Sequence, residues 1–203
     1  KQLFGVFVGM GGYSNGELAS LISAETCVQE FSRKTNNINK DWLNSLFLEM
    51  NQRVCNKSNE DSSNMGSTAT IAVLDKQDLI IGHIGDSKIF KIRNNSIFQI
   101  SIDHIDERSK YLGKTKGLLT QFIGVHEEDL RIEPQIELVQ VEKGDIYILC
   151  SDGMTDVINQ DSILDSFNQN QMNIEETAKK LFIQSLENGS KDNITILVFK
   201  VCN

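Results

Sequence analysis

The sequence predicts an α+β fold, a layered sandwich of antiparallel strands with helices grouped in pairs. Apolar residues recur at helical spacing in two pairs of segments, and elsewhere they follow the period of two that is typical of strands. The central strand-like segments are joined by short turns, which favours antiparallel neighbours because parallel strands need long crossovers. Strands and helices do not alternate along the chain, so the pattern excludes a Rossmann fold.

The chain opens with "FGVFVGMGG", residues 4–12, an apolar strand that ends in a glycine-rich turn. Amphipathic spacing predicts helices over residues 15–34, 40–55, 160–170 and 174–189. A polar loop over residues 56–67 separates the first helix pair from the strands that follow. β-Branched and aromatic residues predict those strands and the later ones over residues 68–75, 78–85, 87–93, 96–101, 136–141, 145–150 and 193–201.

The composition is that of one globular domain spanning residues 1–203, with 39% hydrophobic and 24% charged residues. The formal charge of −8 argues against a nucleic-acid partner, because phosphate backbones need clustered Lys and Arg. No apolar run has the length needed for membrane insertion. Cys27 and Cys150 fall within apolar patterns, so we expect reduced core cysteines and an intracellular, cytoplasmic protein.

Acidic residues occur in three turns, each at the end of an apolar strand. Asp86 lies in "HIGDSK", Asp152 and Asp156 lie in "LCSDGMTD", and Asp192 lies in "GSKDNIT". Taken alone, each of these aspartates can also be explained as a residue that is common in turns at strand ends. Together they indicate a site for Mg²⁺ or Mn²⁺, because converging carboxylates repel one another unless a cation lies among them. The three histidines are isolated in the sequence, and none has the spacing of a zinc site.

Five ordered motifs resemble those of the metal-dependent protein Ser/Thr phosphatases of the type 2C class. "LFGVFVGMGG" is similar to the family's FGVFDGHGG, "GSTATIAVL" to its GSTA strand, and "HIGDSKIF" to its VGDSR element. "DIYILCSDGMTDVI" resembles LLLASDGLWDVM, and "GSKDNITILV" resembles SRDNITVIV. The resemblance covers nearly the whole chain and implies an α-β-β-α sandwich of two antiparallel sheets flanked by helix pairs. It also implies that the family's flap falls over residues 103–129, where the usual LTRALGD-like element reads "LTQFIGV".

The resemblance implies that this chain lacks the central catalytic groups of the family. In active members the Asp of DGHGG bridges two Mn²⁺ or Mg²⁺ ions, the adjacent Gly carbonyl binds one ion, and the His protonates the leaving alkoxide. The matching positions here are Val8, Gly9 and Met10. An Arg that binds phosphate and a Glu that binds the second metal lie on family strands upstream of this motif, so we expect the chain to lack those N-terminal strands.

The remaining acidic residues are less changed. The resemblance implies that Asp152 and Asp192 bind the first metal and that Asp86, Asp152 and Asp156 surround a third, weaker site. We therefore expect at most one residual Mg²⁺ or Mn²⁺, and no catalytic residue at the degenerate positions Val8 and Met10. The first functional interpretation is an inactive pseudophosphatase that binds a protein partner or a phosphoprotein as a regulatory module. The alternative is an active Mn/Mg-dependent phosphatase with a modified metal site.

Overall fold

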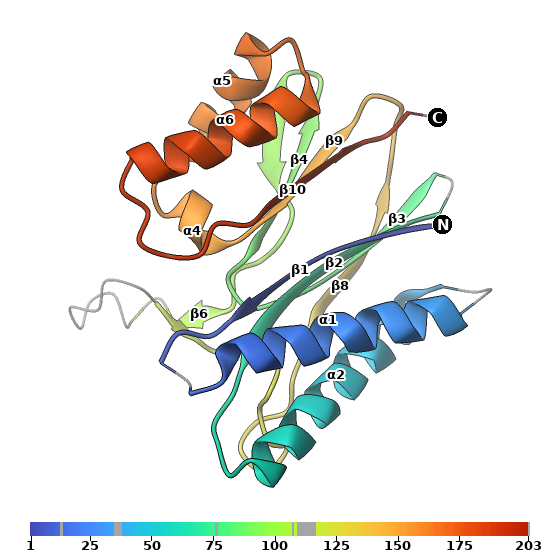
Figure 1. The fold of residues 1–203 in the computed structure, drawn as a ribbon. Coiled ribbons are helices and arrows are strands. Elements are labelled where there is room, and N and C mark those ends of the chain that lie inside the picture. Colours follow the sequence, from blue (N-terminus) through green and yellow to red (C-terminus); the bar gives the residue numbers. More distant parts are fainter. Residues whose placement is uncertain (13, 35–37, 76, 107, 109–116, 203) are drawn as a thin grey trace.

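The computed structural model describes residues 1–12, 14–34, 38–75, 77–106, 108 and 117–202, and it confirms the predicted sandwich. Two four-stranded antiparallel sheets pack face to face, with α1 and α2 outside one sheet and α4, α5 and α6 outside the other (Figure 1). The helices are α1 (Gly16–Arg33), α2 (Lys40–Glu60), α4 (Asp152–Thr155), α5 (Gln160–Gln169) and α6 (Ile174–Glu187). The strands are β1 (Gln2–Gly9), β2 (Ser67–Asp75), β3 (Asp78–Ile84), β4 (Lys88–Arg93), β5 (Ser96–Gln99), β6 (Ile105–Asp106), β7 (Leu118–Leu119), β8 (Gln135–Gln140), β9 (Ile146–Cys150) and β10 (Ile196–Lys200).

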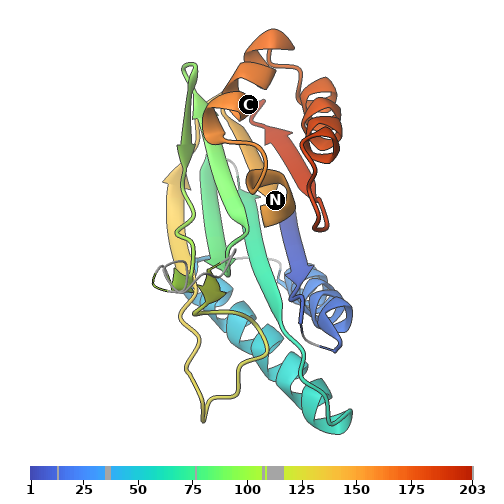
Figure 2. The same ribbon diagram turned by 90° about the vertical axis from the view of Figure 1, so that its left-hand side faces the viewer.

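The two large sheets differ in their strand order. Sheet A has the order β1-β2-β3-β8, and sheet B has the order β10-β9-β4-β5. The short strands β6 and β7 form a separate pair. In the view of Figure 2, the chain between β7 and β8 descends beside α2. None of the helices in the described ranges is both long and apolar enough to cross a membrane.

The prediction that short turns join antiparallel neighbours holds for two hairpins and is wrong for one connection. β2 pairs with β3, and β4 pairs with β5 through a turn in which Asn94 and Asn95 have φ values of 49° and 58°. The three residues between β3 and β4 instead carry the chain from sheet A to sheet B. Gly85, the first residue of this connection, has a φ of +111°, a conformation that favours glycine.

Two helix boundaries also differ from the prediction. The second helix was expected to end at Cys55, but α2 continues to Glu60. The last turn is polar in sequence, yet Ser58 is buried and Lys57 forms an ion pair with Asp61 at 2.8 Å, so the turn is stabilised by packing and charge rather than by an apolar repeat. The single helical turn α4 was not predicted, because four residues are too few to show a helical period.

The core divides into layers that follow the alternation of each strand. Phe4, Val6 and Val8 of β1 pack into the cluster between the sheets, whereas Leu3 and Phe7 pack with the cluster beneath α1 and α2. Aromatic rings join the two sheets, since Phe4 stacks on Phe199 with ring centroids 4.0 Å apart. The predicted core cysteines Cys27 and Cys150 are buried and free.

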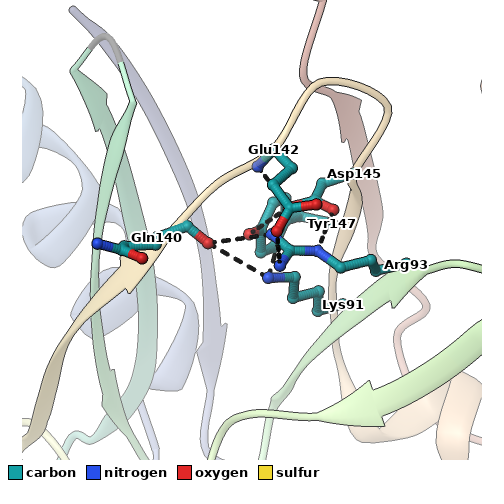
Figure 3. Close-up of polar contacts among 6 residues, drawn as sticks. All are labelled: Lys91, Arg93, Gln140, Glu142, Asp145 and Tyr147. Atoms are coloured by element: carbon teal, nitrogen blue, oxygen red, sulfur yellow. Dashed lines mark hydrogen bonds and ion pairs between the residues drawn. The ribbon is translucent and has the colours of Figure 1, made fainter.

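A charged cluster joins the sheets at the end opposite to the β1–α1 turn (Figure 3). Arg93 donates two hydrogen bonds to Asp145, from Nε to Oδ1 at 2.7 Å and from Nη2 to Oδ2 at 2.6 Å. The carboxylate of Asp145 is almost fully buried, and Lys91 lies 3.4 Å from it. Lys91 and Arg93 also donate to the carbonyl of Gln140 on β8, so the cluster connects sheet B to sheet A.

Candidate functional site

The end of β1 carries Val8, the first position at which the motif departs from the type 2C pattern. Val8 pairs with Thr68 of β2, and its carbonyl accepts a hydrogen bond from the Ser67 hydroxyl at 3.1 Å. Its half-buried side chain packs with the apolar cluster between the sheets. An isopropyl group has no atom that can ligate a cation, so this position adds apolar packing where the motif's Asp would add a charge.

Gly9 at the end of β1 and Gly12 in the turn that follows each occupy a position that favours glycine. A Cβ on Gly9 would lie 2.3 Å from both the backbone carbon and the carbonyl oxygen of Gly16, so β1 and α1 can approach this closely only at a glycine. Gly12 has a φ of +93°. The amide of Met10 donates to the carbonyl of Gly66 at 2.9 Å, and its Sδ would lie 2.7 Å from a Cβ on Gly66. Met10 therefore packs its thioether over Gly66 and offers no proton to a leaving group.

The aspartates predicted as metal ligands lie at one end of the sandwich. The β3–β4 connection, which contains Asp86, joins the ends of two strands that belong to different sheets. In sheet B the last residue of β9, Cys150, pairs with Lys88 and Ile196, so Asp152 and Asp192 adjoin the same strand ends as Asp86. In sheet A this is the end at which Gly9 pairs with Ser67. The topology thus places the β1 turn and these three aspartates at a common end.

Two of these aspartates lie on segments that are in direct backbone contact. The Ser151 hydroxyl donates to the carbonyl of Asn193 at 2.8 Å and accepts from the amide of Thr195 at 2.9 Å. A Cβ on Gly153 would lie 3.2 Å from the carbonyl oxygen of Asp192. These contacts hold the start of α4, and with it Asp152, against the chain that leads into β10.

Asp156 lies further from this contact. It is the C-terminal capping residue of α4 and is exposed, as is Asp192, whereas Asp86 and Asp152 are half-buried. Within the described ranges, no three His, Cys, Asp or Glu side chains are grouped as ligands of a metal ion would be. The metal-binding role of the four aspartates and of the Gly9 carbonyl therefore stays a prediction.

His83 and His104, which are isolated from each other in the sequence, lie together in the fold. His83 and His104 stack with ring centroids 5.4 Å apart. Fully buried His83 accepts from the Thr70 hydroxyl at Nδ1 and donates from Nε2 to the carbonyl of Gly85, each at 3.0 Å. Burial, followed by the charge of His104, lowers the pKa of His83 to about 3.

His104 holds the other side of the same glycine. Its Nδ1 accepts from the amide of Gly85 at 3.1 Å, and burial lowers its pKa. Both imidazoles are therefore neutral near pH 7, and they fix the backbone immediately before Asp86. The 20 residues that separate the two histidines in the sequence show no local pattern that would reveal this contact.

The segment expected to form the flap is described only in part, since residues 107 and 109–116 lie outside the described residues. Its first part forms β6, and its last part forms β7 and an isolated bridge between Ile123 and Ser67. The bridge consists of two backbone hydrogen bonds of 3.0 and 2.8 Å. The altered "LTQFIGV" element is thus attached to the start of β2, beside the β1 turn.

Comparison with known proteins identifies the class to which this fold and this strand-end arrangement belong. The family model described as "Protein phosphatase 2C" matches residues 1–110, and the chain belongs to that family. The serine/threonine phosphatase stp of Listeria welshimeri is 25% identical over 207 residues, which cover 94% of this chain and 81% of that protein. The serine/threonine protein phosphatase PstP of Mycobacterium tuberculosis is 26% identical over 98% of this chain and 40% of its own length.

Solved structures support the same fold. The crystal structure of M. tuberculosis PstP/Ppp superposes with a TM-score of 0.86 at 23% identity, covering 100% of this chain and 89% of that one. A structure of the PstP catalytic domain in complex with two manganese ions has a TM-score of 0.84 at 24% identity, with 100% and 88% of the two chains covered. At this level of identity the likeness establishes the architecture.

The donor atoms at the β1 turn do not fit the two-ion centre that the family implies. Bridging two cations requires an anionic oxygen, and Val8 presents only methyl groups that pack with the inter-sheet core. The neighbouring Met10 has a thioether, which is a poor ligand for Mg²⁺ or Mn²⁺. The aspartates at the other strand ends carry carboxylate oxygens, which are the donors that such a cation prefers.

Proposed function

We propose that this member of the protein phosphatase 2C family does not turn over phosphoesters and acts as a protein-binding or regulatory module. In this proposal residues 1–203 form one domain that docks a protein partner or holds a phosphorylated segment without cleaving it. The packing of Val8 into the core between the sheets, where the family motif has its bridging Asp, is the observation that carries the proposal.

The expected loss of rate is large because two catalytic contributions are absent together. A positioned general acid contributes about 10²–10⁴ in rate, and Met10 has no proton to transfer. A water activated by two cations contributes the nucleophile, and Val8 cannot help to hold those cations. Each loss alone would slow hydrolysis severely, and both occur within three residues of the same turn.

A single cation remains compatible with the proposal. Asp152 and Asp192 lie on contacting segments, so their carboxylates are candidate ligands of one Mg²⁺ or Mn²⁺, and the carbonyl of Gly9 is the ligand that the β1 turn keeps for the family's second ion. Asp86 and Asp156 would lie around a further metal site with weaker affinity. Such an ion would stabilise the strand ends by offsetting carboxylate repulsion and would have a structural role.

The alternative is an active phosphatase with a modified metal site. It is favoured by the relatives, because those at 25–26% identity are named serine/threonine phosphatases. It requires that another oxygen donor replace the bridging carboxylate at the β1 turn. The methyl groups of Val8 pack with the inter-sheet cluster at the position of that carboxylate, which favours the inactive module.

Hydrolysis of a small aryl phosphate with millimolar Mn²⁺ distinguishes the two functions. We expect the wild-type domain to show no Mn²⁺-dependent turnover above that of Asp152→Asn, which removes one candidate ligand and serves as the matched control. Turnover in the wild type that Asp152→Asn abolishes would establish the active enzyme and refute the proposal.

A further inference from the structure

A groove runs between α2 and the chain segment over residues 122–132, close to the β1 turn. One hollow, of about 600 Å³, lies along the C-terminal half of α2. A second hollow, of about 650 Å³, begins at Gly12 and Ser14 after the β1 turn. Val125 and His126 line both hollows, so the two adjoin each other. Figure 2 shows the segment that forms the outer wall lying beside α2.

The floor of the groove is preorganised by buried contacts. Asn51 accepts hydrogen bonds from the amides of Gly124 at 2.7 Å and Val125 at 3.1 Å, and it donates to the carbonyl of Val125 at 2.9 Å. The thiol of Cys55 donates to the same carbonyl at 3.3 Å. Together with Ile132, these residues form a largely apolar base that is fixed before any ligand arrives.

One wall consists of amide side chains at helical spacing. Gln52, Asn56 and Asn59 lie on one face of α2 and are exposed, and their side chains have no hydrogen-bond partner in the part of the chain that the structure describes. Residues four apart on a helix are separated by about 6 Å along its axis, and alternate residues of an extended strand are roughly 6.6 Å apart. Amides one turn apart on α2 can therefore face alternate residues of an extended peptide. Each amide offers a donor and an acceptor, which is the complement of a peptide group.

The opposite wall is acidic. Glu127 and Asp129 line the two hollows, Glu128 and Glu133 are exposed next to them in the sequence, and Arg131, which also lines the groove, is the one cation among them. None of these four carboxylates forms an ion pair within the described ranges. The formal charge of −8 on the whole chain adds a field of the same sign. A ligand with positive side chains is therefore the electrostatic complement of this groove.

We propose that the groove between α2 and residues 122–132 binds an extended, basic peptide segment of a protein partner. The amides of α2 pair with the peptide backbone, the apolar floor receives small alternate side chains, and the acidic wall attracts the basic ones. The inference rests on the proposed function only in that the partner is a protein. Phosphate hydrolysis plays no part in it, so a positive turnover assay would leave this inference standing.

The probe is a fluorescein-labelled peptide of about eight residues that alternates Lys and Ala, roughly 26 Å long when extended. A peptide of alternating Glu and Ala is the comparison, and binding is measured by fluorescence anisotropy at low and high salt. We expect the Lys peptide to bind the wild-type domain more weakly as salt increases, and the Glu peptide not to bind.

Two variants locate the site, each with a matched control outside the groove. Asn56→Ala with Asn59→Ala should weaken binding of the Lys peptide about tenfold, whereas Asn44→Ala, an exposed residue of the same helix, should not change it. Glu127→Lys should weaken binding severalfold more than Glu25→Lys on α1.

All five substituted positions are exposed, so the melting temperatures of the four variants are expected to match the wild type and confirm folding. Equal affinity of all variants would place the peptide elsewhere. Equal affinity for the Glu peptide, or no binding of the Lys peptide at millimolar concentration, would also overturn the inference.

Discussion

Acid should destabilise this domain through His83 before most carboxylates titrate. The imidazole is fully buried and neutral, with a pKa lowered to about 3 chiefly by burial. In the unfolded chain the same group has a pKa of about 6.5. Between these two values the unfolded state binds a proton that the folded state does not, so stability falls as the pH falls.

The magnitude follows from the two pKa values. Each pH unit below about 6.5 costs roughly 1.4 kcal/mol, so His83 should remove about 2 kcal/mol of unfolding free energy between pH 6.5 and pH 5. At pH 3 the cumulative loss approaches about 4–5 kcal/mol, a large part of the 5–15 kcal/mol typical of a domain. His104, whose pKa is also lowered by burial, changes stability in the same direction.

Urea unfolding at a series of pH values between 8 and 5 measures this slope. His83→Gln is the test variant, because its amide can still donate to the carbonyl of Gly85 but does not titrate. We expect it to be less stable than the wild type at pH 8 and to lose less stability on acidification. The same slope in His83→Gln and the wild type would refute the account of a buried neutral imidazole.

Three further predictions test the charged cluster around Asp145, the residual cation site and the close approach of β1 to α1. Arg93→Met should cost about 3 kcal/mol, or roughly 6–12 °C in Tm by calorimetry, because it removes two hydrogen bonds to the buried carboxylate of Asp145 and leaves Lys91 as its only ion-pair partner among the described residues. A loss below that of Arg93→Lys would contradict this. Mn²⁺ at ~100 times its Kd should add about 2.7 kcal/mol and raise Tm by about 5–10 °C, so an unchanged Tm at millimolar Mn²⁺ would argue against a residual site. Gly9→Ala should destabilise by at least about 2 kcal/mol, because its Cβ would meet the Gly16 backbone at 2.3 Å, whereas Gly11→Ala, with no atom within 4 Å, should be near neutral in urea unfolding.

Local pattern was sufficient to predict most of the elements. Helical spacing located α1, α5 and α6 to within a few residues, because each has a regular apolar face. The end of α2 was placed too early, since its last turn depends on the burial of Ser58 and on the Lys57–Asp61 ion pair, neither of which is periodic.

The order in which the strands assemble into sheets was harder to predict from the sequence than the strands themselves. A short connection usually implies a hairpin, and the crossing between β3 and β4 became visible only when the left-handed Gly85 and the pairing partners of each strand were known. For the same reason, motif order could place Asp86, Asp152 and Asp192 at strand ends, but the stacking of His83 on His104 around Gly85 required the folded chain.

Titration calorimetry with Mn²⁺ on the wild type and Val8→Asp tests the central claim most directly. The account predicts at most one weakly bound ion in the wild type, because Val8 offers no ligand between the sheets. It also predicts tighter Mn²⁺ binding and lower metal-free stability in Val8→Asp, which adds a carboxylate beside the acidic strand ends. Two ions bound by the wild type, or an affinity that Val8→Asp leaves unchanged, would contradict the claim that residue 8 decides the loss of the catalytic centre.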